Sequence, residues 1–292
     1  MKRSLLFIVN PISGIGKQKK IEDLLKDHLD NSLLDYTVRY TERVHHGSEL
    51  AREAVEQGCF DAIVAVGGDG SVNDVVSGMA GSNLTLGIIP CGSGNGLARN
   101  LKIPLTPSHA IEVLNHYKVA EIDTIYINEH VVTSIAGIGF DARVARRMKQ
   151  AKARGLQAYA KIILSDYPTY KEQIFRLNID GKEVERKAWF ISFANSNQFG
   201  YNTAIAPLAK LDDGLIDVCI VDRIPLLHLP LSAPLLYLNH FELSQHVEYY
   251  KAREVTVYNN DEKWVNIDGE GERIGKELHI VNLRKSLKVL VP

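Results

Sequence analysis

The residues best suited to chemistry form two glycine-rich loops, each placed directly after an apolar run. Residues 62–66 are small and β-branched, as in a buried parallel strand, and Gly-Gly-Asp-Gly-Ser follows at 67–71. Residues 84–89 are again strand-like and lead into a second glycine-rich loop at 90–96. Glycine lets the backbone approach a ligand closely, and two such loops at adjacent strand ends can face a polyphosphate with N–H groups. We therefore expect phosphate binding, with the Asp69 carboxylate at the carboxyl end of a strand.

A third loop of this kind comes first in the chain. The apolar run 5–9 is followed by Asn10 and by a turn rich in Pro, Ser and Gly that leads to Lys17. The spacing differs from that of a Walker A loop, and the chain has no Gly-x-Gly-x-x-Gly dinucleotide fingerprint followed by an acidic residue. The two best-known nucleotide-binding loops are therefore excluded.

Strand and helix signals alternate over the first part of the chain, residues 1–123. This alternation predicts an α/β domain with a doubly wound parallel sheet that is covered on both faces. The strand signals lie at 4–9, 35–40, 61–66, 85–89 and 119–123, and the helix signals lie at 17–29, 46–57, 72–80, 94–100 and 107–116.

The character of the chain changes at residue 124. Residues 124–132 and 175–184 each predict a hairpin, the second with Asp180-Gly181 as its turn. Strand patterns continue at 255–258 and 264–270, so we predict a β-rich, sandwich-like second domain. The strand-like tail 286–291 completes the pattern.

The composition of the 292 residues excludes several classes of protein. A formal net charge of −1 argues against nucleic acid as a partner. Three cysteines without metal-ligand spacing fit a reducing cytoplasm. No apolar run reaches the length of a membrane span, so we expect any membrane contact to be peripheral, at the inner face of the membrane.

The three loops, 10–14, 67–73 and 90–99, resemble those of the diacylglycerol kinase catalytic family, which includes sphingosine and ceramide kinases. The resemblance implies a nucleotide-binding domain over 1–123, similar to phosphofructokinase and NAD kinase and completed by 284–292. It also implies a β-rich lipid-binding domain over 124–283. The implied reaction transfers the γ-phosphate of ATP, with Mg²⁺, to a lipid hydroxyl at a membrane surface.

The resemblance also assigns roles to residues of the loops. Thr41 shortly before a His matches a family feature, and Arg147 and Arg154 are within the basic segment expected to reach ATP phosphates. The complete set of nucleotide-binding candidates is Asn10, Thr41, Gly68, Gly70, Ser71, Gly92, Ser93, Gly94, Asn95, Arg154 and Asp268.

Three carboxylates are the catalytic candidates: Asp69, Glu270 and Asp123. Asp69 is expected to orient the lipid hydroxyl or to hold Mg²⁺ through water; alternatively it only bonds to nearby backbone N–H groups. Glu270 follows Asp268-Gly269, a hairpin turn that also matches a functional Asp-Gly-Glu of the family. The choice between Asp69 and Glu270 as the base stays open, and a domain-boundary hydrogen bond is the alternative role of Asp123.

Two further candidates come from the second domain. Asp141 is expected to bind the lipid headgroup, as a similar acidic residue does in sphingosine kinases; the alternative is a helix N-cap. Asp213, with the backbone carbonyls of Lys210 and Leu215, resembles a structural Mg²⁺ site of bacterial family members. The alternative there is an Asp-Gly turn between strands.

Other questions stay open at this stage. Residues 224–238 form the most apolar stretch, which either packs in the core or docks on a membrane; its three prolines argue against one straight helix. Gly96 stands where many bacterial diacylglycerol kinases carry Asp, so the lipid acceptor, diacylglycerol or a sphingoid type, is not assigned. The rival functions are a soluble-acceptor kinase of the NAD-kinase type and a non-catalytic lipid- or nucleotide-binding protein. A homodimer is left open.

Overall fold

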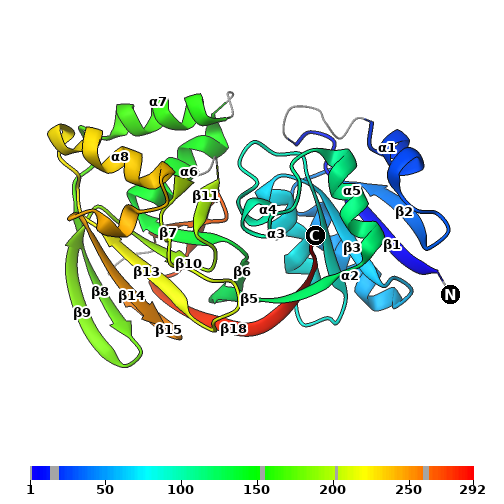
Figure 1. The fold of residues 1–292 in the computed structure, drawn as a ribbon. Helices are drawn as coiled ribbons and strands as arrows, with labels where there is room; N and C mark the ends of the chain where they lie inside the picture. The colour runs from blue at the N-terminus through cyan, green and yellow to red at the C-terminus, as the bar shows by residue number, and fades with distance from the viewer. Residues whose placement is uncertain (1, 14–19, 152–154, 201–202, 259–262) are drawn as a thin grey trace. The chain divides into compact units, whose positions relative to one another are not determined.

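The computed structural model describes residues 2–13, 20–151, 155–200, 203–258 and 263–292 (Figure 1). The chain divides into two compact units. The first comprises Met1–Ile122 and Lys285–Pro292, and the second comprises Asp123–Arg284.

The first unit is built on a parallel sheet. Its strands lie in the order β2-β1-β3-β4-β18, and neighbouring strands in this order run parallel. The strands β1, β3 and β4 are almost entirely buried, because helices cover both faces of the sheet. The strands are β1 (Arg3–Val9), β2 (Leu34–Tyr40), β3 (Ala62–Gly67), β4 (Thr85–Pro90) and the end of β18 (Glu277–Leu290).

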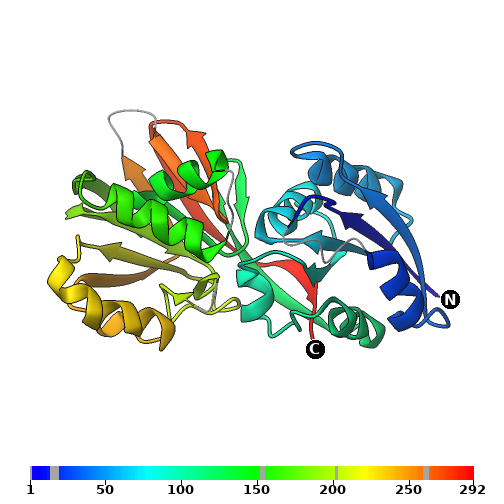
Figure 2. The same ribbon diagram turned by 90° about the horizontal axis from the view of Figure 1, so that it is seen from above.

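Helices lie on both faces of this sheet. Figure 2 shows α2 and α3 packed together on one face and α1 and α5 on the other. The prediction of an α/β domain with a doubly wound parallel sheet is therefore confirmed. The helices are α1 (Ile21–His28), α2 (His46–Gln57), α3 (Asp69–Met79), α4 (Gly96–Asn100) and α5 (Pro107–His116).

The second unit contains antiparallel sheets. One has the order β14-β13-β10-β7-β16-β17; another contains β15, β8 and β9 together with β5, β6 and the first part of β18. A small ribbon of β11 and β12 lies apart from them. The strands are β5 (Val119–Ile127), β6 (His130–Val132), β7 (Ile135–Gly139), β8 (Gln173–Ile179), β9 (Lys182–Ala188), β10 (Phe190–Ala194), β11 (Gln198–Gly200), β12 (Thr203–Ala204), β13 (Ile216–Val221), β14 (Val247–Ala252), β15 (Glu254–Tyr258), β16 (Lys263–Ile267) and β17 (Glu270–Ile274).

One apolar core holds the two larger sheets of the second unit together. Phe175 and Leu177 of β8 share this core with Ile191 and Phe193 of β10. The predicted hairpins form as expected, since Ile127 pairs with His130 and Ile179 pairs with Lys182. The prediction of a β-rich, sandwich-like second domain is confirmed.

Two long strands differ from the prediction. The strand expected at 119–123 continues without a break to Ile127, and the strand expected at 286–291 is the end of one that begins at Glu277. Both strands pass from one unit to the other along the chain. The middle of β18 is exposed, and a pattern of alternation does not mark such a section as part of a strand.

Helices of the second unit are α6 (Phe140–Gln150), α7 (Leu156–Asp166) and α8 (Leu229–Tyr237), with 3₁₀ turns at Leu226–His228 and Phe241–Leu243. In the apolar stretch 224–238, Pro225 precedes the 3₁₀ turn, Pro230 lies in the first turn of α8 and Pro234 lies inside the helix. No helix among the described residues is both long enough and apolar enough to cross a membrane.

Candidate active site

The loop after β3 runs directly into α3. Gly68 precedes the helix in an extended conformation, and Asp69 is the first helical residue, three residues earlier than predicted. The Asp69 carboxylate accepts a hydrogen bond from the backbone N–H of Gly96 at 2.7 Å. Asp69 therefore joins the loop after β3 to the first residue of α4.

The backbones of the loops after β3 and β4 approach each other closely. A Cβ atom added to Gly92 would lie 2.5 Å from the Cα of Gly68 and 2.8 Å from the side-chain oxygen of Asn95. A Cβ on Gly67 would lie 2.4 Å from the hydroxyl oxygen of Ser71. Glycine is thus required at these two positions, and bare backbone lies beside the N-terminus of α3. This arrangement fits a phosphate-binding cradle.

The loop after β4 is held in shape by its own side chains. Asn95, in the left-handed conformation with φ of 53°, accepts a hydrogen bond from Gly92 N–H at 3.0 Å and donates one to the Gly92 carbonyl at 2.8 Å. Arg99 donates to the Gly94 carbonyl at 2.9 Å. Asn95 therefore maintains the loop, while Ser93 is the exposed residue at its tip.

The loop after β1 meets the same edge of the sheet. The Asn10 side chain donates to the Ser71 hydroxyl at 3.0 Å, and its backbone N–H donates to the Val66 carbonyl at 3.1 Å. The backbone N–H of Thr41 donates to the Val9 carbonyl at 2.9 Å. Residues from three loops and from the end of β2 therefore gather at the carboxyl ends of the parallel strands.

In the second unit, Asp268 is buried in a cage of hydrogen-bond donors. It is 7% exposed, and one of its oxygens accepts bonds from the N–H and the hydroxyl of Thr133, both at 2.7 Å. The other oxygen accepts from the N–H groups of Ser134 at 2.8 Å and Ile135 at 2.9 Å. These bonds fix the turn between β16 and β17. Nucleotide binding by Asp268 stays a prediction.

Glu270 opens β17 on the far side of this turn. Its side chain is 48% exposed, and Lys149 of α6 lies 3.8 Å from its carboxylate. Lys149 contacts Glu272 more closely, at 2.7 Å. Glu270 is therefore presented on a rigid turn with its carboxylate accessible.

Asp141 lies in the first turn of α6 and is 5% exposed. Gly139 occupies the N-cap position, so the alternative that Asp141 is the N-cap is wrong. The side-chain amide of Asn266 donates to the Asp141 carboxylate at 2.8 Å. Burial raises the pKa of Asp141 to about 6, and the bond from Asn266 opposes that rise.

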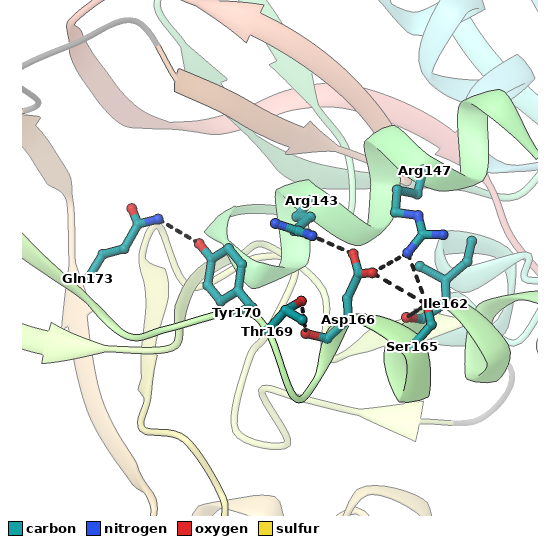
Figure 3. A network of polar contacts seen from close by, with 8 residues as sticks. All are labelled: Arg143, Arg147, Ile162, Ser165, Asp166, Thr169, Tyr170 and Gln173. Atoms are coloured by element: carbon teal, nitrogen blue, oxygen red, sulfur yellow. Dashed lines mark hydrogen bonds and ion pairs between the residues drawn. The ribbon is translucent and has the colours of Figure 1, made fainter.

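The basic face of α6 is partly neutralised within the second unit. Figure 3 shows Arg143 and Arg147 directed at the Asp166 carboxylate, with Arg143 at 2.6 Å. Burial alone would raise the pKa of Asp166, but the two guanidinium groups lower it overall. Arg147 also donates to the Ser165 hydroxyl at 2.9 Å. Arg147 thus has partners in this unit, and Arg154 lies outside the described residues.

The ammonium group of Lys251, a residue of β14, lies beside the loop expected to bind Mg²⁺. Lys251 places its ammonium 2.9 Å from the Asp213 carboxylate and 3.2 Å from that of Asp217. The carbonyl of Leu215 accepts a bond from Asn282 at 3.2 Å. The positive charge of Lys251 compensates the Asp213 carboxylate in this arrangement, and Mg²⁺ binding by Asp213, Lys210 and Leu215 stays a prediction. Among the residues that the structure describes, no three His, Cys, Asp or Glu side chains gather as metal ligands.

Asp123 is completely buried and supports the same loop. Its carboxylate accepts a bond from the Gly214 N–H at 2.6 Å. The Asn195 side chain donates both to the Asp123 carbonyl at 2.8 Å and to the Thr133 carbonyl at 2.9 Å. Asn195 therefore connects Asp123 with the strand end that cages Asp268. A catalytic role for Asp123 stays a prediction.

Sequence reasoning did not single out Asn266 or Asn195, which connect these acidic residues. One signal was present for Asn266: it stands two residues before Asp-Gly, as Asn178 does in the other hairpin. Asn195 had no local signal, because its partners come from distant strands.

Known families and proteins match both parts of the chain. Residues 4–127 match the model of the diacylglycerol kinase catalytic domain, and residues 134–290 match that of the YegS C-terminal NAD kinase beta sandwich-like domain. Diacylglycerol kinases of Bacillus subtilis and Staphylococcus saprophyticus are 28% and 27% identical over 100% of this chain and 97% and 96% of their own lengths. A crystal structure described as a diacylglycerol kinase of Bacillus anthracis has the same fold, with a TM-score of 0.77, 23% identity and coverage of 100% and 97%. The chain belongs to the diacylglycerol kinase catalytic-domain family.

Proposed function

We propose that this protein is an ATP-dependent lipid kinase that transfers the γ-phosphate to the hydroxyl of a diacylglycerol or sphingoid-type lipid. One observation carries the proposal: the loops after β3 and β4 approach so closely that Gly92 has no room for a Cβ beside Gly68, and Asp69 joins the two loops through its bond to Gly96. Bare backbone at the start of a helix of 11 residues suits a polyphosphate.

The first unit would bind ATP. N–H groups of the loops, with Asn10 and Ser71, would hold the phosphates, and Mg²⁺ would neutralise part of their charge when bound. Asp69 is the carboxylate nearest to these loops and the candidate to orient the metal. Its bond to Gly96 keeps it in one position.

The second unit would bind and activate the acceptor. Glu270 is the better candidate base, because its carboxylate is half exposed on a fixed turn, whereas Asp69 is committed to Gly96. The buried carboxylate of Asp141 is the candidate for the polar headgroup. Phosphoryl transfer has a loose transition state, so positioning contributes more than deprotonation.

A peripheral contact with a lipid bilayer is part of the proposal. Five leucines between residues 226 and 243 are exposed, among them Leu227 at 84% and Leu231 at 75%; the others are Leu226, Leu238 and Leu243. Such a concentration of exposed apolar side chains suits the interfacial region of a membrane. Replacing Leu227 and Leu231 by Glu should abolish co-sedimentation with vesicles. Activity on a short-chain, water-soluble acceptor should persist, and unchanged sedimentation would contradict this role.

The function is tested by incubating the protein with labelled ATP, Mg²⁺ and separate detergent dispersions of diacylglycerol, sphingoid bases, ceramide and phosphatidylglycerol. We expect label in one lipid class, and loss of the label with Asp69→Ala. Label in NAD but in no lipid would instead support a soluble-acceptor kinase. ATP binding without transfer to any acceptor would support a binding protein.

A further inference from the structure

Two hairpins of the second unit contain the same tetrapeptide, Asn-Ile-Asp-Gly. It occupies residues 178–181 between β8 and β9, and residues 266–269 between β16 and β17. Both Asp residues have φ of 47°, and the following glycines have φ of 85° and 94°. Positive φ at both central positions is typical of the tight type I′ turn.

The Asn of the tetrapeptide makes the same hydrogen bond within the turn in each hairpin. The side-chain oxygen of Asn178 accepts the Gly181 N–H at 2.7 Å, and that of Asn266 accepts the Gly269 N–H at 2.9 Å. The Asp of each turn then accepts backbone N–H groups of a neighbouring segment: Asp180 from Arg253 at 3.0 Å, and Asp268 from Ser134 at 2.8 Å. The turn itself is therefore one structural module used twice.

The two modules differ in the burial of the Asn and in the contacts of its side-chain amide. Asn178 is half-buried and Asp180 is exposed. Asn266 is only 5% exposed, and its amide donates to the equally buried Asp141 at 2.8 Å. Only the second module therefore joins its turn to a buried carboxylate of a helix.

The strand register explains how this contact forms. Asn266 pairs with Gly137 across β16 and β7, and a Cβ on Gly137 would lie 2.0 Å from the Asp141 carboxylate. The missing side chain at Gly137 leaves room for the carboxylate to meet Asn266. On the other strand of the hairpin, at the residue that pairs with Asn266, α6 packs directly on β17, since a Cβ on Gly271 would lie 2.8 Å from the backbone of Arg146.

We propose that Asn266 is a positioning residue that couples Asp141 to the turn carrying Glu270, so that α6 and the β16–β17 hairpin act as one rigid element. Its side-chain nitrogen donates to Asp141 of the helix, and its side-chain oxygen accepts the Gly269 N–H of the turn. A headgroup bound at Asp141 would then be held in fixed relation to Glu270. This consequence for catalysis rests on the proposed lipid kinase function, but the coupling itself does not.

The test compares Asn266→Ala with the matched control Asn178→Ala, since each removes the same bond within a turn. Hydrogen–deuterium exchange should increase at residues 268–272 and also at the start of α6 with Asn266→Ala, but only around residues 180–183 with Asn178→Ala. The kcat on the preferred lipid should fall at least tenfold with Asn266→Ala, with a smaller change in KM, and by less than twofold with Asn178→Ala. Increased exchange confined to the turn in Asn266→Ala would overturn the coupling. If no lipid is phosphorylated by the wild-type protein, the exchange data still decide the inference while the proposed function fails.

Exchanging the residue types at positions 266 and 141 distinguishes loss of the coupling from a failure to fold. Asn266→Asp alone places two carboxylates against each other, so exchange at α6 should increase. Adding Asp141→Asn restores the bond with donor and acceptor reversed and keeps the bond to Gly269. This double variant should recover the protection of α6 and of the turn. Failure to recover protection, in a variant with wild-type circular dichroism, would contradict the inference.

Discussion

The hairpins at 178–182 and 266–270 differ in one residue, Lys182 against Glu270, yet their surroundings are opposite. The Asp of the first is exposed and accepts N–H groups at the start of β15, whereas the Asp of the second is 7% exposed and accepts four hydrogen bonds. The tetrapeptide thus specifies the conformation of the turn but not the contacts of its Asp. Those contacts depend on the strands and the helix that the strand register places beside the turn.

The largest difference is expected when each Asp becomes Asn, which tolerates the positive φ of the turn. In Asp268→Asn, an NH₂ group replaces a carboxylate oxygen that accepts two hydrogen bonds, and both bonds are lost. We therefore expect the free energy of unfolding to fall by about 3 kcal/mol or more. Activity should fall at least a hundredfold. Asp180→Asn should cost about 1 kcal/mol, because its carboxylate is exposed. Urea titration and kinetic assays measure both, and equal losses would remove the distinction between the hairpins.

The next largest effect concerns Asp141, which only the second hairpin contacts. Its folded pKa is raised from 3.8 to about 6, so the folded state binds the proton more tightly and the carboxylate destabilises the fold as pH rises from about 4 to 6. Asp141→Asn should therefore stabilise the protein by up to about 3 kcal/mol above pH 6, and this gain should vanish below pH 4. The kcat/KM on the lipid should still fall at least tenfold.

Asp166→Asn is the control for that experiment, because its expected change in stability has the opposite sign. Arg143 and Arg147 lower the pKa of Asp166, so its carboxylate stabilises the fold near neutral pH and the variant should lose stability there. Unfolding midpoints measured from pH 4 to 8 separate the two cases. A loss of stability in Asp141→Asn at pH 7 would show that the buried Asp141 carboxylate does not destabilise the fold.

The smallest effect is expected at Lys149, the surface residue beside Glu270. Its contact at 3.8 Å joins two half-exposed groups, and such pairs contribute little. Lys149→Met should change kcat by less than about threefold, and added salt should reduce the difference further. Lys2→Met, which breaks the surface pair with Asp35, serves as the control. A loss of tenfold or more would mean that Lys149 takes part in the reaction.

Much of the fold could be predicted from local signals. The buried strand before Gly67 is apolar throughout, and the turns at Asp180 and Asp268 are specified by Asp-Gly alone. The three loops also carried enough residues to indicate the family.

The contacts that organise the second unit could not be predicted in the same way. Asn266 meets Asp141 because β16 pairs with β7, and Lys251 meets Asp213 and Asp217 because β14 pairs with β13. Each contact joins residues more than thirty positions apart through a register that is set by the whole sheet. For this reason the sequence did not predict that the Lys251 ammonium lies beside the loop expected to bind Mg²⁺.

The most direct test exchanges the single residue that separates the hairpins, in the variant Lys182→Glu/Glu270→Lys. It keeps the composition, the net charge and both Asn-Ile-Asp-Gly turns. With labelled ATP and the preferred lipid, the account predicts at least a hundredfold loss in kcat for the double variant and for Glu270→Lys, and less than twofold for Lys182→Glu. Retained activity in the double variant, or an equal loss in Lys182→Glu, would contradict the claim that one hairpin is catalytic and the other structural.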